Sequence, residues 1–256
     1  KQSIKNLYVY TKRNKAITLM KYFIIVLLSS LTLASNPEGR FDSKVKYEYN
    51  VFLEVLNLKL GEASLSINNP DTINDVNVYH LSFNVRTTRL GDTIYKIRNK
   101  IDVWIDQKSL NVVKQDKNIR ELRKKKSSKT IIKDQKGVTN GQEFIVVPNA
   151  FDPYSLILIL SEFDIKENES KQFNIVDAGK NRIIEVKNLG IKKIKTPYGK
   201  HDGYTLSPVK NGQPVLKNKG DMEVTYALID NTLVPAEILI KLSSGVIKLK
   251  LKKIRE

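Results

Sequence analysis

The alternation of apolar and polar residues along the chain indicates β-strands. In Val45–Val55 the odd-numbered positions are apolar and nearly all the even-numbered ones are polar, so one face of this segment packs on a core and the other meets water. The alternation resumes at Leu58–Leu60, changes phase at Gly61 and continues through Ala63–Ile67. This change of phase predicts a β-bulge or a tight connection at Gly61.

Further short strands follow, separated by turn-forming residues. Gly91-Asp92 and Lys136-Gly137 are expected to connect strands, and Gly199–Gly203 and Ile229–Thr232 are expected to be hairpin turns. The pattern predicts a mainly all-β domain, a curved antiparallel meander that forms a sandwich or a partly open barrel. The expected strands are 79–87, 95–105, 110–121, 129–133, 142–147, 171–177, 182–189, 191–196, 204–209, 222–229, 233–242 and 246–254.

One segment departs from the strand pattern. Asp152 can cap a helix, Pro153 suits the first helical position because its φ is preset, and the apolar run 156–160 follows. We therefore predict one short buried helix near 152–162. A buried strand is the alternative, because runs of Ile and Leu fit both structures.

The N-terminal part has the order of a secretory signal. Met20-Lys21 precedes an apolar run from Tyr22 to Leu33, and the small pair Ala34-Ser35 follows. We expect a signal peptide at 20–34, a short leader at 35–43, one β domain at 44–256 and a periplasmic location. A membrane anchor is the alternative, but the run is shorter than the ~20 residues that span a bilayer. Residues 1–19 are expected to be a misassigned upstream segment, with a cytoplasmic arm or an extended targeting segment as the alternative.

Composition adds two constraints to this picture. The chain has no cysteine, so we expect neither a disulfide nor the lipid attachment site of a lipoprotein. Its 44 Lys and Arg outnumber its 27 Asp and Glu, for a formal net charge of +17, and six of the basic residues lie in the first 34 positions, where there is no acid.

A set of short motifs occurs in a fixed order along the chain: Leu60-Gly-Glu-Ala63, Val103-Trp-Ile-Asp106, Phe151-Asp-Pro-Tyr-Ser-Leu156, Thr196-Pro-Tyr-Gly199, Lys219-Gly-Asp-Met222, Val234-Pro-Ala236 and a closing strand after Gly245. With these motifs the chain resembles an exported bacterial family, the domain of unknown function 3108, from about Lys44 to Ile254. The resemblance implies this fold and export, and no activity. His201-Asp-Gly203 departs from the cysteine or aliphatic residue that members would show after the Thr-Pro-x-Gly turn.

Few catalytic chemistries fit the residues present. His80 on the polar phase of a strand and His201 in an expected turn are interpreted as structural, and the chain has no G-x-S-x-G elbow, no metal-ligand cluster and no Gly-rich nucleotide loop. We therefore expect no catalytic residue, no metal and no cofactor. A pair of catalytic carboxylates stays open, because several could meet in space: Asp102, Asp106, Asp152, Asp177 and Glu223.

Two sets of residues are candidates for binding. Aromatic positions could line a cavity for an apolar molecule, although a packed core explains them equally: Tyr47, Tyr49, Trp104, Phe151 and Tyr154. A dense basic stretch could attract an anionic surface, although solvated Lys on strands is common: Arg120, Arg123, Lys124, Lys125 and Lys126.

These observations favour a non-enzymatic envelope protein that binds an apolar or amphiphilic molecule such as a lipid. The first alternative is a structural or assembly factor that contacts a protein partner or an anionic membrane surface. The second is a hydrolase built on carboxylates. Nucleic acid is not expected as a partner, because aromatic residues are not interleaved with the basic stretch. The sequence does not determine the oligomeric state.

Overall fold

The computed structural model describes residue 41 and residues 44–210, 213–214, 221–242 and 245–256. They belong to a compact unit that runs from Gly39 to Glu256. The expected upstream segment, the signal peptide and nearly all of the leader lie outside the described residues. None of the helices in the described part is long and apolar enough to cross a membrane.

Strands dominate the first half of this unit. β1 and β2 are joined by a single turn of 3-10 helix, η1 (Glu54–Leu56), and β4 and β5 by the helix α2 (Arg89–Tyr95). The strands are β1 (Lys46–Leu53), β2 (Leu58–Ile67), β3 (Asp71–Ile73), β4 (Val76–Thr87), β5 (Arg98–Asp106), β6 (Val112–Glu121), β7 (Lys124–Lys133), β8 (Lys136–Thr139) and β9 (Gln142–Ile145).

The second half begins with a helix and continues as strands. After β10 come α3 (Pro153–Ile159) and the 3-10 turn η2 (Leu160–Glu162). The strands are β10 (Ala150–Phe151), β11 (Ser170–Asp177), β12 (Lys180–Thr196), β13 (Gly199–Lys210), β14 (Gln213–Pro214), β15 (Asp221–Ile229), β16 (Thr232–Leu242) and β17 (Gly245–Arg255).

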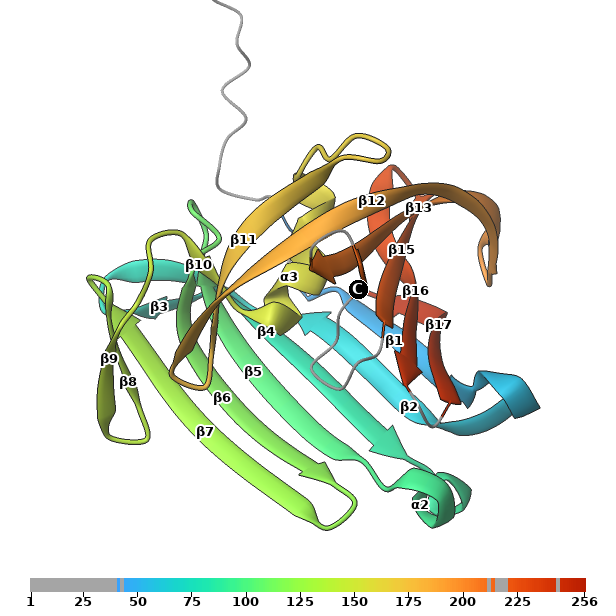
Figure 1. Ribbon diagram of the computed structural model, residues 1–256, viewed down its shortest axis with the longest axis horizontal. Coiled ribbons are helices and arrows are strands. Elements are labelled where there is room, and N and C mark those ends of the chain that lie inside the picture. Colours follow the sequence, from blue (N-terminus) through green and yellow to red (C-terminus); the bar gives the residue numbers. More distant parts are fainter. Residues whose placement is uncertain (1–40, 42–43, 211–212, 215–220, 243–244) are drawn as a thin grey trace, which may run out of the picture. The chain divides into compact units, whose positions relative to one another are not determined.

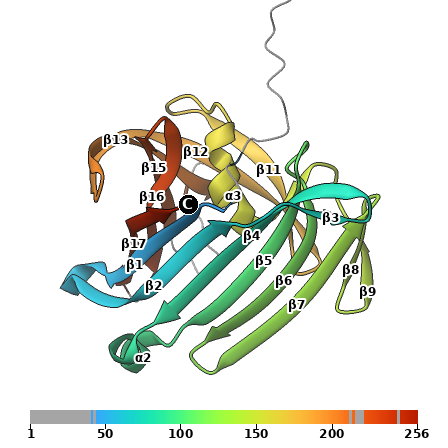
Figure 2. The same cartoon turned by 180° about the vertical axis from the view of Figure 1, so that it is seen from behind.

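All 17 strands of the described residues belong to one sheet that curls around α3 (Figures 1 and 2). β17 pairs with β1 and so joins the two halves, and every pairing is antiparallel except that of β10 with β11. No ladder joins the two ends of the sheet, β9 and β10, within the described chain. The fold prediction is confirmed in its open-barrel form, because one continuous sheet replaces the two sheets of a sandwich.

The predicted irregularity at Gly61 is confirmed as a β-bulge. Val51 pairs with Gly61 and Phe52 with Lys59, so Leu60 is the extra residue. A Cβ on Gly61 would lie 2.4 Å from the carbonyl oxygen of Arg86 on β4. Glycine is therefore required here by the close approach of the neighbouring strand.

The predicted helix is also confirmed. The Asp152 side chain accepts hydrogen bonds from the backbone N–H of Tyr154 at 2.7 Å and of Ser155 at 3.2 Å, and Pro153 occupies the first turn. The apolar residues 156–159 are all buried, and α3 contacts β5, β11 and β16. Because the sheet curls around α3, the core lies between this helix and the concave face of the sheet.

Four local predictions were wrong. Lys136-Gly137 opens β8 and does not connect strands, because Lys133 pairs with Lys136 and the β7–β8 turn lies at 134–135. Residues 89–95 form α2, so the strand expected from Tyr95 begins only at Arg98. The strands expected at 182–189 and 191–196 are one strand, β12, with a register shift between Asn188 and Ile191. The β12–β13 turn lies at 197–198, because Thr196 pairs with Gly199, and His201 is therefore in a strand. The turn expected at Ile229–Thr232 is confirmed.

The antiparallel order places three connections at one end of the sheet. In the neighbour order β1-β2-β4-β5-β6-β7, the links β1–β2, β4–β5 and β6–β7 must all lie at the same end. Leu122 N–H donates to the carbonyl of Lys96 at 2.8 Å, which ties the β6–β7 turn to the segment after α2. Figure 1 shows α2 and the β6–β7 turn at the same end of the sheet. We call this end the α2 rim: η1 with Asn57, residues 88–97, and the tip of the β6–β7 hairpin at 120–126.

Candidate functional site

The concave face of the sheet is apolar, and its burial decreases toward the α2 rim. Along β4, Tyr79 and Leu81 are fully buried, whereas Phe83 and Val85 are only partly buried. On β15 to β17 the inward-facing residues nearest the rim are likewise only partly buried, whereas the next inward-facing residue on each strand is buried: Met222, Ile240 and Ile247, compared with Val224, Ile238 and Leu249. The concave face is therefore sealed at α3 and less covered toward the rim.

A cluster of buried charges lies beside the first turn of α3. Lys117 Nζ is 2.5 Å from Asp152 Oδ2 and 2.9 Å from Asp177 Oδ1, with side-chain exposures of 2% for the lysine, 0% for Asp152 and 30% for Asp177. Gln115 donates from Nε2 to Asp152 Oδ2 and to the Val176 carbonyl, each at 2.7 Å. We call these four side chains the Lys117 cluster. It connects β6 to α3 and to β11.

Electrostatics keep Lys117 charged. Burial alone lowers the pKa of Lys117, but the charges of Asp152 and Asp177 outweigh it, so the net pKa is raised and the lysine stays protonated. Burial raises the pKa of the nearby Tyr154 to about 12, although the Lys117 charge opposes the shift. Gln115 Oε1 is buried and has no hydrogen-bond partner among the described residues. This oxygen can accept a hydrogen bond from a donor of a bound molecule or from water.

The predicted aromatic residues divide between the two faces of the sheet. Tyr47, Tyr49 and Phe151 are buried in one core cluster, against which Tyr154 packs. The Tyr49 hydroxyl donates to the Pro235 carbonyl at 2.7 Å, and burial raises the pKa of Tyr49 well above its usual value. These four residues are thus together in the interior.

Trp104 lies apart from them, on the convex face. Its ring stacks on His80 with centroids 4.4 Å apart, and Lys114 Nζ lies 4.1 Å from the Trp104 centroid. Strand alternation explains the separation, since Val103 and Ile105 on either side of Trp104 point into the core.

His80, Ser82 and Asp102 form a polar group on the same face. Asp102 Oδ1 accepts from Ser82 Oγ at 2.5 Å and lies 3.1 Å from His80 Nε2, whereas Ser82 Oγ is 3.5 Å from His80 Nε2. Burial raises the pKa of Asp102, but the hydrogen bonds from His80 and Ser82 outweigh it, and the net pKa is lowered. A serine nucleophile needs the histidine between serine and acid. Here the acid lies between them, which fits a structural role.

The other candidate carboxylates have partners that fix them. Asp152 and Asp177 do meet, but across Lys117, and Asp152 also caps α3. Asp106 accepts from the backbone N–H of Lys108 and Ser109 in the β5–β6 turn, and Glu223 pairs with Lys241. Over the described residues no three His, Asp or Glu side chains form a group that could hold a metal ion.

An open groove of about 490 Å³ crosses the convex face over β1, β2, β4 and β5. Most of its cations have acidic partners: Arg255 with Glu48, Lys252 with Glu62, and Arg98 with Asp92 of α2. Arg86 has no ion-pair partner among the described residues. The cations that line the groove are Lys46, Arg86, Arg98, Lys100, Lys252 and Arg255, against the acids Glu48 and Glu62.

The predicted basic stretch forms the tip of the β6–β7 hairpin, on the α2 rim. In the backbone register of this hairpin, Glu121 lies opposite Lys124 and Arg120 lies opposite Lys125. The side chains of Arg120, Arg123, Lys124, Lys125 and Lys126 are all exposed.

Sequence reasoning did not find the Lys117 cluster. The sequence of β6 does contain a sign of it. Gln115 and Lys117 alternate with the outward positions in the same way as the apolar Val113 and Ile119, so all four are expected on one face of the strand. Polar residues at inward positions require partners in the interior.

A family model described as "Protein of unknown function (DUF3108)" matches residues 45–252. The chain belongs to this family. A comparison of the DUF3108 chain with curated proteins finds no match.

Three solved structures resemble the DUF3108 chain. One is a β-barrel-like protein of domain of unknown function DUF1849 from Brucella abortus, with 13% identity, a TM-score of 0.51, and coverage of 83% of this chain and 97% of that one. At this identity the likeness shows the fold alone. The second, from Bacteroides fragilis, is inferred to be exported and has a YmcC-like fold (8% identity, TM-score 0.39, coverage 84% and 97%). The third, from Parabacteroides distasonis, is inferred to be a lipoprotein. It has 9% identity and a TM-score of 0.34, and the match covers 84% of this chain and 96% of that one.

Proposed function

We propose that this DUF3108 protein is an exported, non-enzymatic binding module that holds an apolar or amphiphilic molecule of the cell envelope on the concave face of its sheet. The observation that carries the proposal is the gradient of burial on that face. Phe83, Val85, Ile240 and Ile247 are apolar, point inward, and are not fully covered near the α2 rim. An apolar chain laid against them would remove this surface from water.

The Lys117 cluster supports an amphiphilic ligand. Tyr154 and Phe83 have ring centroids 5.5 Å apart, and Lys117 Nζ is 5.1 Å from the Tyr154 centroid, so the apolar face and the charged cluster adjoin. Asp177 is partly exposed, and Gln115 Oε1 is an acceptor without a partner among the described residues. A ligand that carries a hydroxyl or amide donor beside an apolar chain matches this arrangement.

The test compares two neighbouring substitutions on β4. Val85→Glu places a charge on the concave face, where Val85 packs against the core, whereas Asn84→Glu places the same charge on the convex face, because neighbours on a strand point to opposite faces. Protein purified gently from its own envelope is analysed by native mass spectrometry and by lipid extraction. We expect wild type and Asn84→Glu to carry an amphiphile, and Val85→Glu to carry roughly tenfold less, a loss of about 1.4 kcal/mol.

Two controls complete the test. Thermal unfolding shows whether Val85→Glu is folded, and Met222→Gln, a milder change on the same face, is expected to reduce occupancy as well. The proposal fails if no apolar or amphiphilic molecule copurifies with the wild-type protein, or if the two β4 variants retain it equally.

A further inference from the structure

The α2 rim carries large apolar side chains that face solvent. They come from all three of its connections and are between 46% and 76% exposed: Val55 and Leu56 on η1, Leu90 and Ile94 on α2, and Leu122 in the β6–β7 turn. Neighbouring strands lie about 4.8 Å apart, so the tips are spaced roughly 10 Å from one connection to the next and roughly 20 Å across the rim. The apolar residues are therefore distributed along the rim and do not form a single patch.

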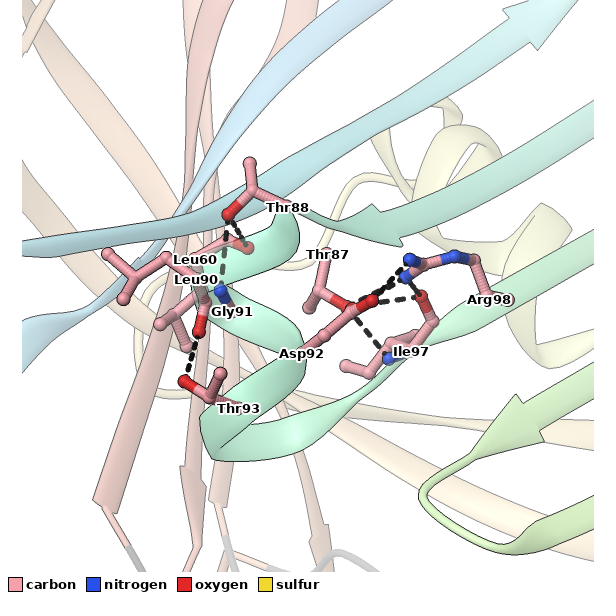
Figure 3. A network of polar contacts seen from close by, with 9 residues as sticks. All are labelled: Leu60, Thr87, Thr88, Leu90, Gly91, Asp92, Thr93, Ile97 and Arg98. Carbon is pink, nitrogen blue, oxygen red and sulfur yellow. Dashed lines mark hydrogen bonds and ion pairs between the residues drawn. The ribbon is translucent and has the colours of Figure 1, made fainter.

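α2 is fixed firmly on the sheet, as Figure 3 shows. Thr88 N–H and Oγ1 both donate to the Leu60 carbonyl, at 2.8 Å and 3.1 Å, and Gly91 N–H donates to Thr88 Oγ1. A Cβ on Gly91 would lie 2.0 Å from the Leu60 carbonyl oxygen, so only glycine permits this approach.

An ion pair anchors the opposite side of α2. Arg98 donates to both carboxylate oxygens of Asp92, at 2.9 Å and 2.6 Å, and Thr87 Oγ1 donates to Asp92 Oδ1 (Figure 3). The Arg98 hydrogen bonds lower the pKa of Asp92, and that from Thr87 adds to them. With this side held, Leu90 and Ile94 are presented outward on a rigid element.

The charges of the rim are unbalanced in favour of cations. Its acids are engaged: Glu54 pairs with Lys248, Asp92 with Arg98, and Glu121 accepts from Asn99. Exposed cations without an ion-pair partner among the described residues surround the apolar tips: Arg89, Lys96, Arg120, Arg123, Lys124 and Lys125. The rim therefore combines separated apolar tips with free positive charge.

We propose that the α2 rim docks on an anionic lipid bilayer, with Leu90, Ile94 and Leu122 inserted among the headgroups and the surrounding Arg and Lys in contact with lipid phosphates. Apolar insertion and electrostatic attraction are the two components of interfacial binding. A planar surface suits tips spread across the rim, whereas a protein partner would need a matching pocket for each tip. This inference does not rest on the proposed ligand of the concave face.

The test measures partitioning of the full protein onto vesicles by co-sedimentation. The vesicles are phosphatidylcholine alone or phosphatidylcholine with one third phosphatidylglycerol. We expect binding to the anionic vesicles at about 0.1 M salt, weaker binding at about 0.5 M salt, and little binding to the neutral ones. All variants carry the same N-terminal segment, so differences between them report on the rim alone.

Matched variants separate the rim from the rest of the surface. Leu90→Ser with Leu122→Ser is expected to lower partitioning about tenfold. Leu228→Ser with Leu233→Ser, at the β15–β16 turn on the opposite end of the sheet, is expected to leave it unchanged. For charge, Lys124→Glu is expected to lower it about fivefold, whereas Lys108→Glu in the β5–β6 turn is not.

Three outcomes would overturn the inference: equal binding to neutral and anionic vesicles, no binding to either, or equal loss in the two double variants. In a fourth outcome, Leu90→Ser with Leu122→Ser leaves vesicle binding unchanged but abolishes a crosslink that the wild-type protein forms to another protein at position 122. That result would identify the rim as a protein interface and reject the bilayer. Val85→Glu is expected to bind vesicles normally, so this proposal and that for the concave face succeed or fail separately.

Discussion

Lys117 illustrates how a single residue constrains the interior. A protonated lysine that is almost completely buried is tolerated only with close partners, and Asp152 and Asp177 provide them from α3 and β11. The three groups therefore specify how β6, α3 and β11 are positioned relative to one another. Because Asp152 also caps α3, the orientation of the helix is coupled to that ion pair.

We predict that Lys117→Met destabilises the protein by about 3–5 kcal/mol, because it leaves two carboxylates without their cation. Adding Asp152→Asn removes the buried charge while the amide oxygen can still cap α3, and it should recover a substantial part of the loss. Urea unfolding of both variants measures the free energies. A cost below about 1 kcal/mol for the single variant, or additive costs in the double variant, would show that the ion pair does not hold the interior together.

Residue positions were predictable from the sequence where local chemistry decides them. Asp152 as a cap and Gly61 as a bulge residue follow from rules that involve only near neighbours. Trp104 was assigned to the interior, although its alternation with the core residues Val103 and Ile105 places it on the other face. Lys117 did not follow, because its partner Asp177 comes from another strand. Which residues meet across a sheet depends on a register that strand alternation alone does not set.

At the scale of elements, α2 is the informative case. Its sequence contains Gly91 and Asp92, which favour turns in isolation, and the pattern therefore predicted a connection. The helix forms because the contacts of Thr88 with Leu60 and of Asp92 with Arg98 override local preference. By contrast, α3 combines a local cap with burial, so sequence and tertiary structure agree.

Whether Gly91→Ala stabilises or destabilises the protein tests this account of α2. Gly→Ala in an exposed helix normally stabilises by about 1 kcal/mol. For Gly91→Ala we predict the opposite, a loss of about 1–3 kcal/mol, because the added Cβ would overlap the Leu60 backbone and lift α2 from β2. Thermal and urea unfolding decide between the signs, and a stabilised variant would refute the proposed packing of α2.

At the scale of the whole domain, strand alternation indicated a curved antiparallel sheet, and the structure gives the same class. The sequence did not reveal how the curvature is achieved. β1 and β17 are the first and last strands of the described chain, and they pair with each other. This pairing joins two meanders into one sheet. The gradient of burial on the concave face depends on that closure, and so could not be read from any single strand.

The unpaired ends of the sheet have a consequence for local opening. β9 and β10 each have a backbone ladder on one side only, to β8 and β11 respectively. Between them the chain is held by side chains: Asn181 donates to the Ile145 carbonyl at 2.7 Å, and Asn174 to the Pro148 carbonyl at 2.8 Å. Most other strands have a backbone ladder on both sides, so opening here should have the lowest free energy.

Amide hydrogen exchange should therefore be fastest within the sheet at Gln142–Phe151 and slowest in β1 and β17. Asn181→Ala should accelerate exchange in the first region and leave β1 and β17 unchanged, as followed by mass spectrometry. Uniform protection across the sheet would argue against such a weak point. With local opening at this site, β9 and β10 can move apart while the β1–β17 ladder stays intact. The interior of the curled sheet would then widen at the β9–β10 gap.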